Sequence, residues 1–253
     1  MKILTDTQLR ARWFKTRCGE YTVEEDTFVT PAARDFLKEH GIALRRASPG
    51  EGYGVMPQTA IPPAGSAARY LDADTGEAMG EKPEHMTHLR GNLLVPKGHP
   101  RILFRGKLDT LEARIMETQI AACDEGFPQI AEALEELYGC VRAILGAEVK
   151  EAPLPDQALL GLDSAGLRRV SHHVKEEIGI PHPVPSYRMG RLCVALNSLR
   201  TCVRETELAA VAAFCQGADC SRPDIIQALN RLSSAVYILF CRKLAGYYGE
   251  GSK

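Results

Sequence analysis

Charged and polar side chains interrupt an otherwise core-like helical segment near the end of the chain. Asn197, Arg200, Arg204 and Glu207 follow one another at intervals of three, four and three residues. At about 100° per residue, this spacing places all four on one side of a helix. A charge in an apolar face is costly unless it is paired or binds a ligand. The spacing therefore predicts a polar stripe that is the best candidate for the functional site of the chain.

A second polar stripe lies in the next segment, where Gln227, Asn230, Ser234 and Tyr237 repeat at intervals of three and four. Apolar residues around them predict a broad buried face. These are Ile226, Leu229, Leu232, Val236, Leu239 and Phe240. The two stripes can face each other across a helix pair. From spacing alone, a buried ion-pair network or a solvated surface explains the charges about as well as a binding site does.

A polar loop precedes another predicted helix. Lys97, Arg101 and Arg105 lie in or just after this loop, in the stretch VPKGHPRILFRG. Backbone N–H groups at a helix N-terminus and nearby cations can together bind a phosphate. The chain has neither the GxxxxGKS/T motif of a P-loop nor the GxGxxG motif of a dinucleotide fold. A nucleotide would therefore need a pocket of another kind.

The elements that must position these residues are mostly helices, so the predicted fold class is mainly α. Ser221, Arg222, Pro223 and Asp224 form a clear helix start, because Pro suits the first turn and an acid favours the positive end of the helix. The last two segments are long, and the set predicts a helical bundle. Five helical segments are predicted, over about 104–123, 128–145, 164–178, 188–216 and 222–248.

The first 47 residues predict a small mixed α/β unit. Thr30 can cap a helix whose first residue is Pro31, and Gly41 can end it. Strands are predicted at 21–23, 27–29 and 42–46, with a short helix at 7–15. Residues 48–83 are rich in Gly, Pro and Ala and predict a linker or long loop. The predicted domains are thus 1–47, a linker at 48–83, and a helical domain at 84–253.

Composition excludes several classes of protein. The 253 residues are 45% hydrophobic and 25% charged, which suits a globular fold with a substantial core. The formal net charge of -1 gives no general attraction to nucleic acid or to an anionic membrane. The N-terminal residues lack the apolar core of a signal peptide, and we expect no membrane span. We therefore expect a cytoplasmic protein.

Eight cysteines are scattered through the chain without a CxxC motif. In mostly apolar helical contexts, we expect buried reduced thiols in place of disulfides or metal ligands. No structural metal is predicted. The cysteines are Cys18, Cys123, Cys140, Cys193, Cys202, Cys215, Cys220 and Cys241.

Several separated motifs resemble those of one enzyme family. The stretch VPKGHPRILFRGKLDTLEA is similar to the V-x-K-x-x-P-R-I-x-x-x-G-x-x-D-x-L-x-A stretch of the propanediol-utilisation type ATP:corrinoid adenosyltransferases. LRTCVRETE and ALNRLSS resemble that family's R-x-x-x-R-x-x-E and LNRLSD motifs. The resemblance is closer to the ethanolamine-utilisation type cobalamin adenosyltransferases, which share TPAARDFL, THL and RPDIIQALNRLSSAVY.

The resemblance implies a five-helix bundle that forms a homo-oligomer, a dimer or a trimer, with ATP and cobalamin bound near a subunit interface. An external reductant such as reduced flavin would convert cob(II)alamin to cob(I)alamin. The reduced cobalt would attack the 5′ carbon of ATP, which is usually bound with Mg, and adenosylcobalamin and a polyphosphate would result. The implied recipient is a B12-dependent lyase or dehydratase, with association with a bacterial microcompartment.

The resemblance also assigns roles to single residues. Arg200 and Arg204 are implied as catalytic, since a leaving polyphosphate needs oriented positive charge. Asp109 is implied to pair with Arg200 across the subunit interface. Glu207 and Asn230 are implied as ATP contacts.

Further residues are implied at the same site. Lys97 matches the family's phosphate-loop lysine, and Arg101 adds positive charge beside it. Thr87 and His88 lie where the family has a glycine-containing phosphate loop. Arg231 follows Asn230 in the last motif.

Two alternatives stay open at this level. A helical bundle could bind a corrinoid or a nucleotide as a sensor or carrier without turnover, or it could be an oligomeric assembly protein that binds neither. Some ethanolamine-type enzymes carry a cysteine-rich metal motif, but residues 50–85 contain no cysteine, so the resemblance transfers no metal.

Overall fold

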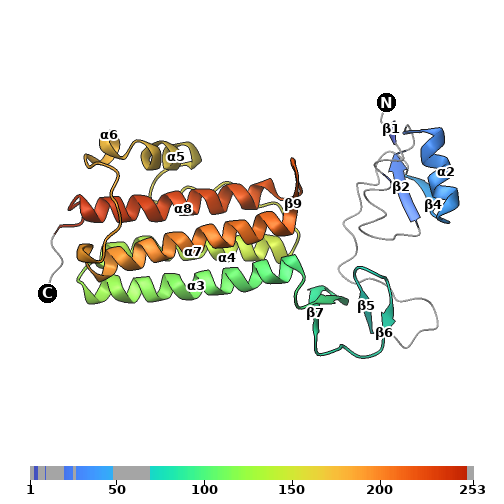
Figure 1. Cartoon of the computed structure of the whole chain (residues 1–253), viewed down its shortest axis with the longest axis horizontal. Coiled ribbons are helices and arrows are strands. Elements are labelled where there is room, and N and C mark those ends of the chain that lie inside the picture. The colour runs from blue at the N-terminus through green and yellow to red at the C-terminus, as the bar shows by residue number, and fades with distance from the viewer. Residues whose placement is uncertain (1–2, 5–8, 10–19, 25–26, 48–68, 250–253) are drawn as a thin grey trace. The chain divides into compact units, whose positions relative to one another are not determined.

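The computed structural model describes residues 3–4, 9, 20–24, 27–47 and 69–249. The chain divides into two compact units, Met1–Lys97 and Gly98–Lys253. In the described residues, the first unit contains small sheets and the helix α2, and the second unit is mainly helical (Figure 1). The prediction of a mainly helical chain is confirmed. Within the described ranges, every helix is too short or too polar to cross a lipid bilayer.

Two pairs of parallel strands begin the first unit. β1 (Ile3–Leu4) pairs with β3 (Phe28–Val29), and β2 (Glu20–Glu24) pairs with β4 (Ala43–Ala47). The three strands predicted from this part of the sequence are therefore present. The predicted helix at 7–15 lies mostly outside the described residues.

The helix α2 (Pro31–Glu39) of this unit forms as its sequence predicts. The hydroxyl of Thr30 accepts a hydrogen bond of 3.3 Å from the backbone N–H of Ala33, and proline occupies the first turn. The chain leaves the helix through Gly41, whose φ of +63° favours glycine. Eight buried residues form a small core: Leu4, Leu9, Val23, Val29, Ala33, Phe36, Leu37 and Ile42.

A four-stranded sheet completes the first unit and corrects the predicted linker. Its order is β6 (Ala78–Met79), β5 (Tyr70–Asp72), β8 (Leu93–Pro96) and β7 (Met86–Arg90). β5 and β8 are parallel, and the other pairs are antiparallel. Strands occupy 70–72 and 78–79, where the sequence predicts a loop, while residues 48–68 lie outside the described ranges.

The strands of this sheet are too short to show a periodic pattern in the sequence. β5 has three residues and β6 has two. The turn between them closes because the Asp72 carboxylate accepts hydrogen bonds from the N–H groups of Asp74 and Thr75, at 2.8 and 2.9 Å. Gly76 supplies the φ of +74° that the turn requires. The central pairing is with β8, which comes later in the chain, so no local pattern reveals it.

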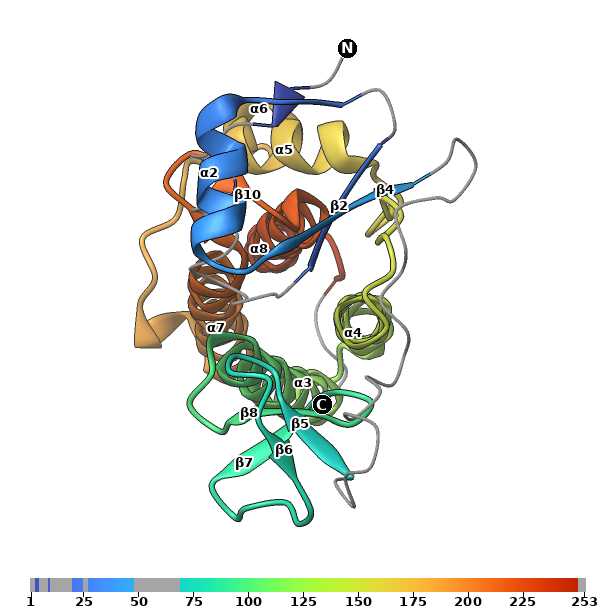
Figure 2. The same cartoon turned by 90° about the vertical axis from the view of Figure 1, so that its right-hand side faces the viewer.

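Four long helices form the second unit. They are α3 (Pro100–Asp124), α4 (Pro128–Val149), α7 (Arg191–Phe214) and α8 (Pro223–Leu244). α3 packs on both α4 and α7, and α8 packs on both α7 and α4, so the four helices surround one core (Figure 2). Fully buried members of this core include Phe104, Leu108, Leu134, Leu137, Leu196, Leu199, Val203, Leu229 and Leu232.

Two short helices replace the single helix predicted over 164–178. α5 (Ser164–His172) and α6 (Val174–Ile178) are separated by His173, whose φ of -118° and ψ of 48° leave the helical region. Both helices pack against α8. The apolar spacing continues across the break through Val170 and Val174, both buried, so periodicity alone could not locate it. A short 3-10 turn, η1 (Tyr187–Met189), precedes α7.

A tight hairpin joins α7 to α8 and corrects the cysteine prediction. β9 (Cys215–Gln216) pairs with β10 (Asp219–Cys220), and a disulfide joins the two cysteines. The expectation of reduced thiols is wrong for this pair. The hairpin turn places Cys215 and Cys220, which are five residues apart in the sequence, directly opposite each other. The expectation of burial is also wrong for Cys123, which is exposed, whereas Cys140, Cys193 and Cys241 are buried thiols.

A buried carboxylate ties α3 to α4. Glu148 has no exposed side-chain surface, and it accepts hydrogen bonds from Arg101 Nε, at 2.6 Å, and from Arg105 Nε. Arg101 also bonds to Glu151 at 2.8 Å. Burial acts to lower the pKa of Arg101, but these two carboxylates outweigh it and leave that pKa raised. The buried Glu148 carboxylate is therefore shared by two guanidinium groups, one of which also pairs with Glu151.

Replacing this carboxylate should destabilise the bundle strongly. Glu148→Ala removes the buried carboxylate that two largely buried guanidinium groups share, and we expect a loss of about 3–5 kcal/mol in the free energy of unfolding. The control is Glu117→Ala, which removes an exposed partner of Arg114 and should cost about 0–1 kcal/mol. Urea unfolding followed by circular dichroism measures both. Equal, small losses in the two variants would contradict the structural role of Glu148.

A second ion pair fixes the start of α8. Arg222 donates to both carboxylate oxygens of Asp224, at 3.0 and 2.8 Å, and to the carbonyl of Ala152 at 3.0 Å. Asp224 also accepts from the N–H of Leu154 at 2.9 Å. The hydrogen bond from Arg222 is the main reason that the pKa of Asp224 falls to about 2. This ion pair anchors the start of α8 to the segment that follows α4.

The lowered pKa of Asp224 predicts a pH dependence of stability. Its usual value is 3.8, so the carboxylate stabilises the fold fully above about pH 4 and loses this contribution as the pH falls through about 2. We expect the stability difference between wild type and Asp224→Asn to be constant above pH 4 and to shrink below it. Urea unfolding between pH 2 and 6 measures this difference. A difference that does not change down to pH 2 would contradict the assignment.

Candidate active site

The two polar stripes predicted from the sequence meet on one helix pair. α7 and α8 pack side by side (Figure 1). Asn230 Nδ2 on α8 donates to Glu207 Oε1 on α7 at 3.3 Å. Arg231 Nη1 donates to Asn230 Oδ1 at 2.6 Å, and its Nε donates to the hydroxyl of Ser164 at 2.9 Å. We name the six residues of this surface the α7–α8 stripe: Asn197, Arg200, Arg204, Glu207, Asn230 and Arg231.

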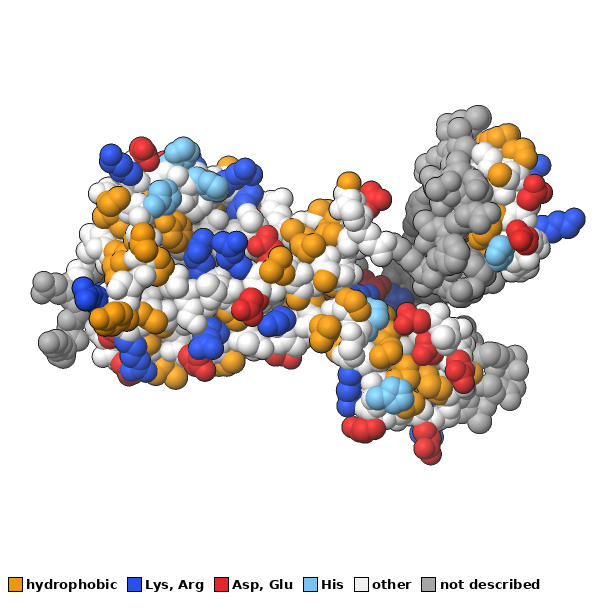
Figure 3. Space-filling view, viewed as in Figure 1, with side chains coloured by type: hydrophobic (Ala, Val, Ile, Leu, Met, Phe, Trp, Pro, Cys, Tyr) orange, Lys and Arg blue, Asp and Glu red, His pale blue; other side chains and the backbone are white. Residues whose placement is uncertain are grey.

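Apolar packing explains why the stripe points outward from the core. On α7, Leu196, Leu199 and Val203 are fully buried, and the stripe residues take the positions beside them. Lys and Arg side chains gather over the middle of α7 and α8, with His side chains over α5 and α6 (Figure 3). The helix pair therefore presents positive charge on a surface that its own apolar residues orient.

Arg200 is held by an aromatic ring. Its guanidinium carbon lies 4.9 Å from the centroid of the Tyr237 ring on α8. Its Nε atom is buried and has no hydrogen-bond partner. Among the described residues, no carboxylate forms an ion pair with it. A ring face attracts the cation without neutralising it, so the charge of Arg200 stays available to an anion.

Arg204 is the second uncompensated cation. It lies one turn after Arg200 and is exposed. No hydrogen bond or ion pair joins it to another residue in the part of the chain that the structure describes. Glu207, one turn further on, is partly buried and already holds Asn230. The stripe thus offers two free guanidinium groups beside a fixed carboxylate–amide pair.

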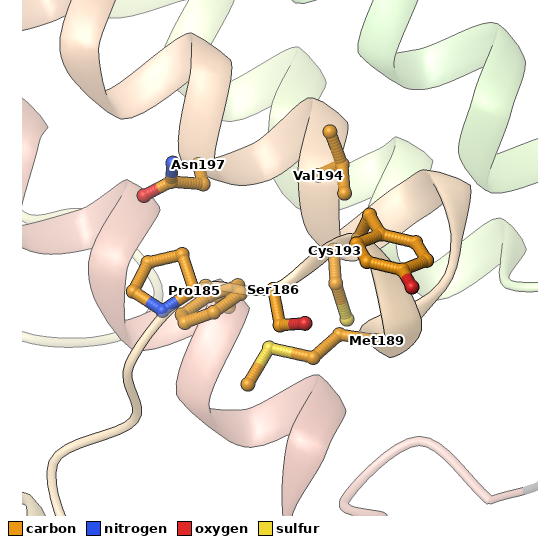
Figure 4. Close-up of a pocket in the computed structure, with 8 residues that line it drawn as sticks. Pro185, Ser186, Met189, Cys193, Val194 and Asn197 are labelled. Atoms are coloured by element: carbon orange, nitrogen blue, oxygen red, sulfur yellow. The ribbon is translucent and has the colours of Figure 1, made fainter.

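A small pocket adjoins the stripe. It has a volume of about 210 Å³ and lies under the segment that precedes α7 (Figure 4). Asn197, one turn before Arg200, and Phe240, one turn after Tyr237, belong to its walls. The remaining walls are mostly apolar: Pro185, Ser186, Tyr187, Met189, Cys193 and Val194. Sequence reasoning missed the four wall residues that precede α7, because their stretch IPHPVPSYRMG has no periodicity.

The size of this pocket limits what it can hold. Pockets that enclose a small molecule measure roughly 300–1,000 Å³. At about 210 Å³, this pocket can take only one edge of a large ligand. Its apolar lining and the adjacent cations suit a ligand with an apolar part and an anionic part. The rest of such a ligand would have to be covered by another protein surface.

Asp109 lies elsewhere on the bundle. It is on α3 and exposed, and in the described part of the chain nothing contacts its carboxylate. The structure does not bring it to Arg200 within one chain. Its predicted pairing with Arg200 of another subunit stays a prediction.

Arg101 has partners of its own. Its guanidinium binds Glu148 and Glu151, and its backbone N–H donates to Nδ1 of His99, the N-cap residue of α3, at 3.2 Å. The structure thus gives it a role in joining α3 to α4. Its contact with phosphate stays a prediction.

Three predicted binding residues belong to the first unit. Thr87 and His88 lie on β7, and His88 Nδ1 is 3.0 Å from the carbonyl oxygen of Gly91. Lys97 follows β8, and its ammonium lies 3.4 Å from the Glu84 carboxylate, with both side chains exposed. Such an exposed pair is weak, so Lys97 can exchange Glu84 for another anion. Their part in the site stays a prediction.

Among the residues that the structure describes, no three His, Cys, Asp or Glu side chains lie close enough together to hold a metal ion. The stripe contains three arginines, two amides and one carboxylate, and its guanidinium groups suit phosphate oxygens.

Comparison with known proteins agrees with this chemistry. Residues 78–243 match the family model "Cobalamin adenosyltransferase". The chain is 31% identical over 250 residues to the corrinoid adenosyltransferase EutT of Salmonella typhimurium, covering 96% of this chain and 92% of that protein. It is also 31% identical to EutT of Escherichia coli K12, covering 93% and 90%. No solved structure matches the chain. All six residues of the α7–α8 stripe fall inside the matched range, and the chain belongs to the cobalamin adenosyltransferase family.

Proposed function

We propose that the α7–α8 stripe and the adjoining pocket bind ATP and cobalamin and transfer the adenosyl group from one to the other. In this reaction the cobalt of cob(I)alamin attacks the 5′ carbon of ATP. A cobalt–carbon bond forms, the bond between the 5′ carbon and its oxygen breaks, and the electron pair leaves with the polyphosphate. An external one-electron reductant, such as reduced flavin, first converts cob(II)alamin to cob(I)alamin.

The observation that carries this proposal is the pair of uncompensated cations beside an apolar pocket. Arg200 and Arg204 have no anionic partner among the described residues, and they lie on consecutive turns of α7. Negative charge grows on the leaving polyphosphate as the bond breaks, and fixed cations stabilise it. No general acid is needed, because the leaving group is already good. Positioning is therefore the main task of the protein.

The stripe also suggests how ATP is oriented. The arginines of α7 would hold the polyphosphate, and the Glu207–Asn230 pair offers a carboxylate oxygen and an amide for the adenosine part. The pocket wall formed by Asn197 and Phe240 lies at the other end of the stripe. A corrinoid edge in this pocket would face the nucleotide. ATP with Mg, cobalamin and the reductant are the substrates and cofactors of this proposal.

A homo-oligomer is part of the proposal. Apolar side chains are exposed on α3 and α7, which pack side by side, and such surfaces often mark protein interfaces. The pocket is too small for a whole corrinoid, so a second subunit could complete the site. α5 and α6 would together take the fifth position of a five-helix bundle. The exposed apolar residues are Leu103, Met116, Ile120, Val194, Leu208 and Val211.

The cellular setting follows by analogy with the relatives. A B12-dependent lyase or dehydratase would receive the adenosylcobalamin. A cytoplasmic location, with association with a bacterial microcompartment, fits that role. No nucleic acid or membrane partner is proposed.

The direct test is anaerobic incubation of the purified protein with ATP, Mg, cob(II)alamin and reduced flavin. We expect light-sensitive adenosylcobalamin in the visible spectrum, at a rate above that of a control without protein. A corrinoid spectral shift without product would support a sensor or carrier. No binding of ATP or corrinoid would support an assembly protein. Either of these two results would contradict the proposed function.

Arg204→Ala should lower kcat by about 10²–10³-fold, because one cation that stabilises the leaving polyphosphate is lost. Arg204 is exposed, so the fold should remain intact. The matched control is Arg142→Ala, which removes an exposed arginine from α4, away from the stripe. Steady-state rates and thermal unfolding are measured for both. A kcat of Arg204→Ala within twofold of wild type would show that this arginine does not stabilise the transition state.

Asp109→Asn should weaken self-association, because the proposed pairing with Arg200 of a second subunit loses its charge. We expect the dissociation constant of the oligomer to rise about tenfold, which corresponds to about 1.4 kcal/mol. Analytical ultracentrifugation measures it over a range of protein concentrations. Asp124→Asn, an exposed change at the end of the same helix, is the control. If both variants associate as wild type does, the proposed pairing is wrong.

A further inference from the structure

Arg200 is supported by a neutral group, and this is unusual for a partly buried cation. Its guanidinium carbon lies 4.9 Å from the centroid of the Tyr237 ring, and its Nε is buried without a partner. Within one chain, no carboxylate among the described residues pairs with it. The ring orients the guanidinium and leaves its N–H groups for the polyphosphate and for the proposed Asp109 contact of a second subunit.

Tyr237 is itself fixed from two sides. Its hydroxyl lies 2.8 Å from Nδ1 of His182, and the two rings are nearly parallel, with an angle of 8° between their planes. Phe240 stacks on it with ring centroids 6.3 Å apart. Burial raises the pKa of Tyr237 to about 12, so the phenol keeps its proton near neutral pH. The ring under Arg200 is therefore held in one orientation.

His182 connects this arrangement to the pocket. It lies on the segment between α6 and η1, three residues before Pro185, which lines the pocket. Phe240 lines the same pocket from α8. The contacts thus run from the pocket-lining segment through His182 and Tyr237 to Arg200. One hydrogen bond and one ring–cation contact join the two ends of the proposed site.

We propose that Tyr237 and His182 are positioning residues that set the guanidinium of Arg200 for the polyphosphate of the nucleotide. This rests on the proposed function, which needs the nucleotide and the corrinoid to be held in one geometry. An in-line displacement requires the reacting atoms to be about 3–3.5 Å apart, so a misplaced cation slows the reaction even when both substrates bind. Tyr237 acts through its ring, and His182 acts by holding that ring.

The first experiment separates the ring from the hydroxyl. Tyr237→Leu removes the ring, and we expect kcat to fall at least tenfold and ATP to bind more weakly. Tyr237→Phe keeps the ring, so it should rescue most of this loss. Tyr247→Leu is the control, because this exposed tyrosine lies under Arg242 in a similar contact, 5.2 Å from centroid to guanidinium carbon, outside the site. Thermal unfolding of each variant shows whether its fold is retained.

The second experiment tests whether the residues act through one another. Tyr237→Phe and His182→Ala break the same hydrogen bond, so the double variant should be no slower than the slower single variant. Likewise, Tyr237→Leu should change ATP affinity less than twofold when it is added to Arg200→Ala. If the fold-changes of the two single variants multiply in either double variant, the two residues act independently, and the proposal is overturned. An unchanged kcat and ATP affinity in Tyr237→Leu would overturn it as well.

Titration calorimetry with ATP keeps this test separate from the proposed reaction. If the wild type binds ATP but makes no adenosylcobalamin, the proposed function fails, and the affinities of Arg200→Ala, Tyr237→Leu and the double variant still test the positioning. The positioning is supported if Arg200→Ala, Tyr237→Leu and the double variant all lose about the same ATP affinity. Wild-type affinity in Tyr237→Leu contradicts it, whatever the outcome of the assay.

Discussion

The packing of α7 against α8 is the constraint on which the rest of the structure depends. Each helix buries one apolar face in the bundle core, and the rotation of the helix that this requires fixes where its polar residues point. The stripe of α7 then meets the stripe of α8, and Glu207 and Asn230 bond across the contact. The disulfide of Cys215 and Cys220 closes the hairpin between the two helices. The site is a consequence of this packing.

The two groups of arginines in the bundle show different uses of the same side chain. Arg101 and Arg105 share the buried carboxylate of Glu148, and Arg101 also pairs with Glu151, so these arginines have partners within the fold and stabilise it. Arg200 and Arg204 have no such partner among the described residues, and Arg200 rests on a ring instead. An unpaired charge is costly where it is buried, as at the Nε of Arg200, whereas Arg204 is exposed to solvent. Two such cations on a surface beside a pocket suit the binding of a polyanion.

Much of this arrangement could be read from the sequence, because it depends on local patterns. The cap at Thr30, the start of α8 and the spacing of the stripe are all set by residues a few positions apart. The short strands at 70–79, the break at His173 and the hairpin disulfide depend on partners or single residues that leave no periodic pattern. The pocket walls at Pro185 and Met189 become visible only when the segment folds over α7. The motif resemblance supplied the reaction, which spacing alone left open.

The most direct test of the central claim is a crystal structure of the protein with ATP and cob(II)alamin bound. The account predicts that the polyphosphate contacts Arg200 and Arg204, that the 5′ carbon points toward the pocket of Asn197 and Phe240, and that the corrinoid edge enters that pocket. Nucleotide bound away from α7, with both arginines free of phosphate, would contradict the assignment of the site.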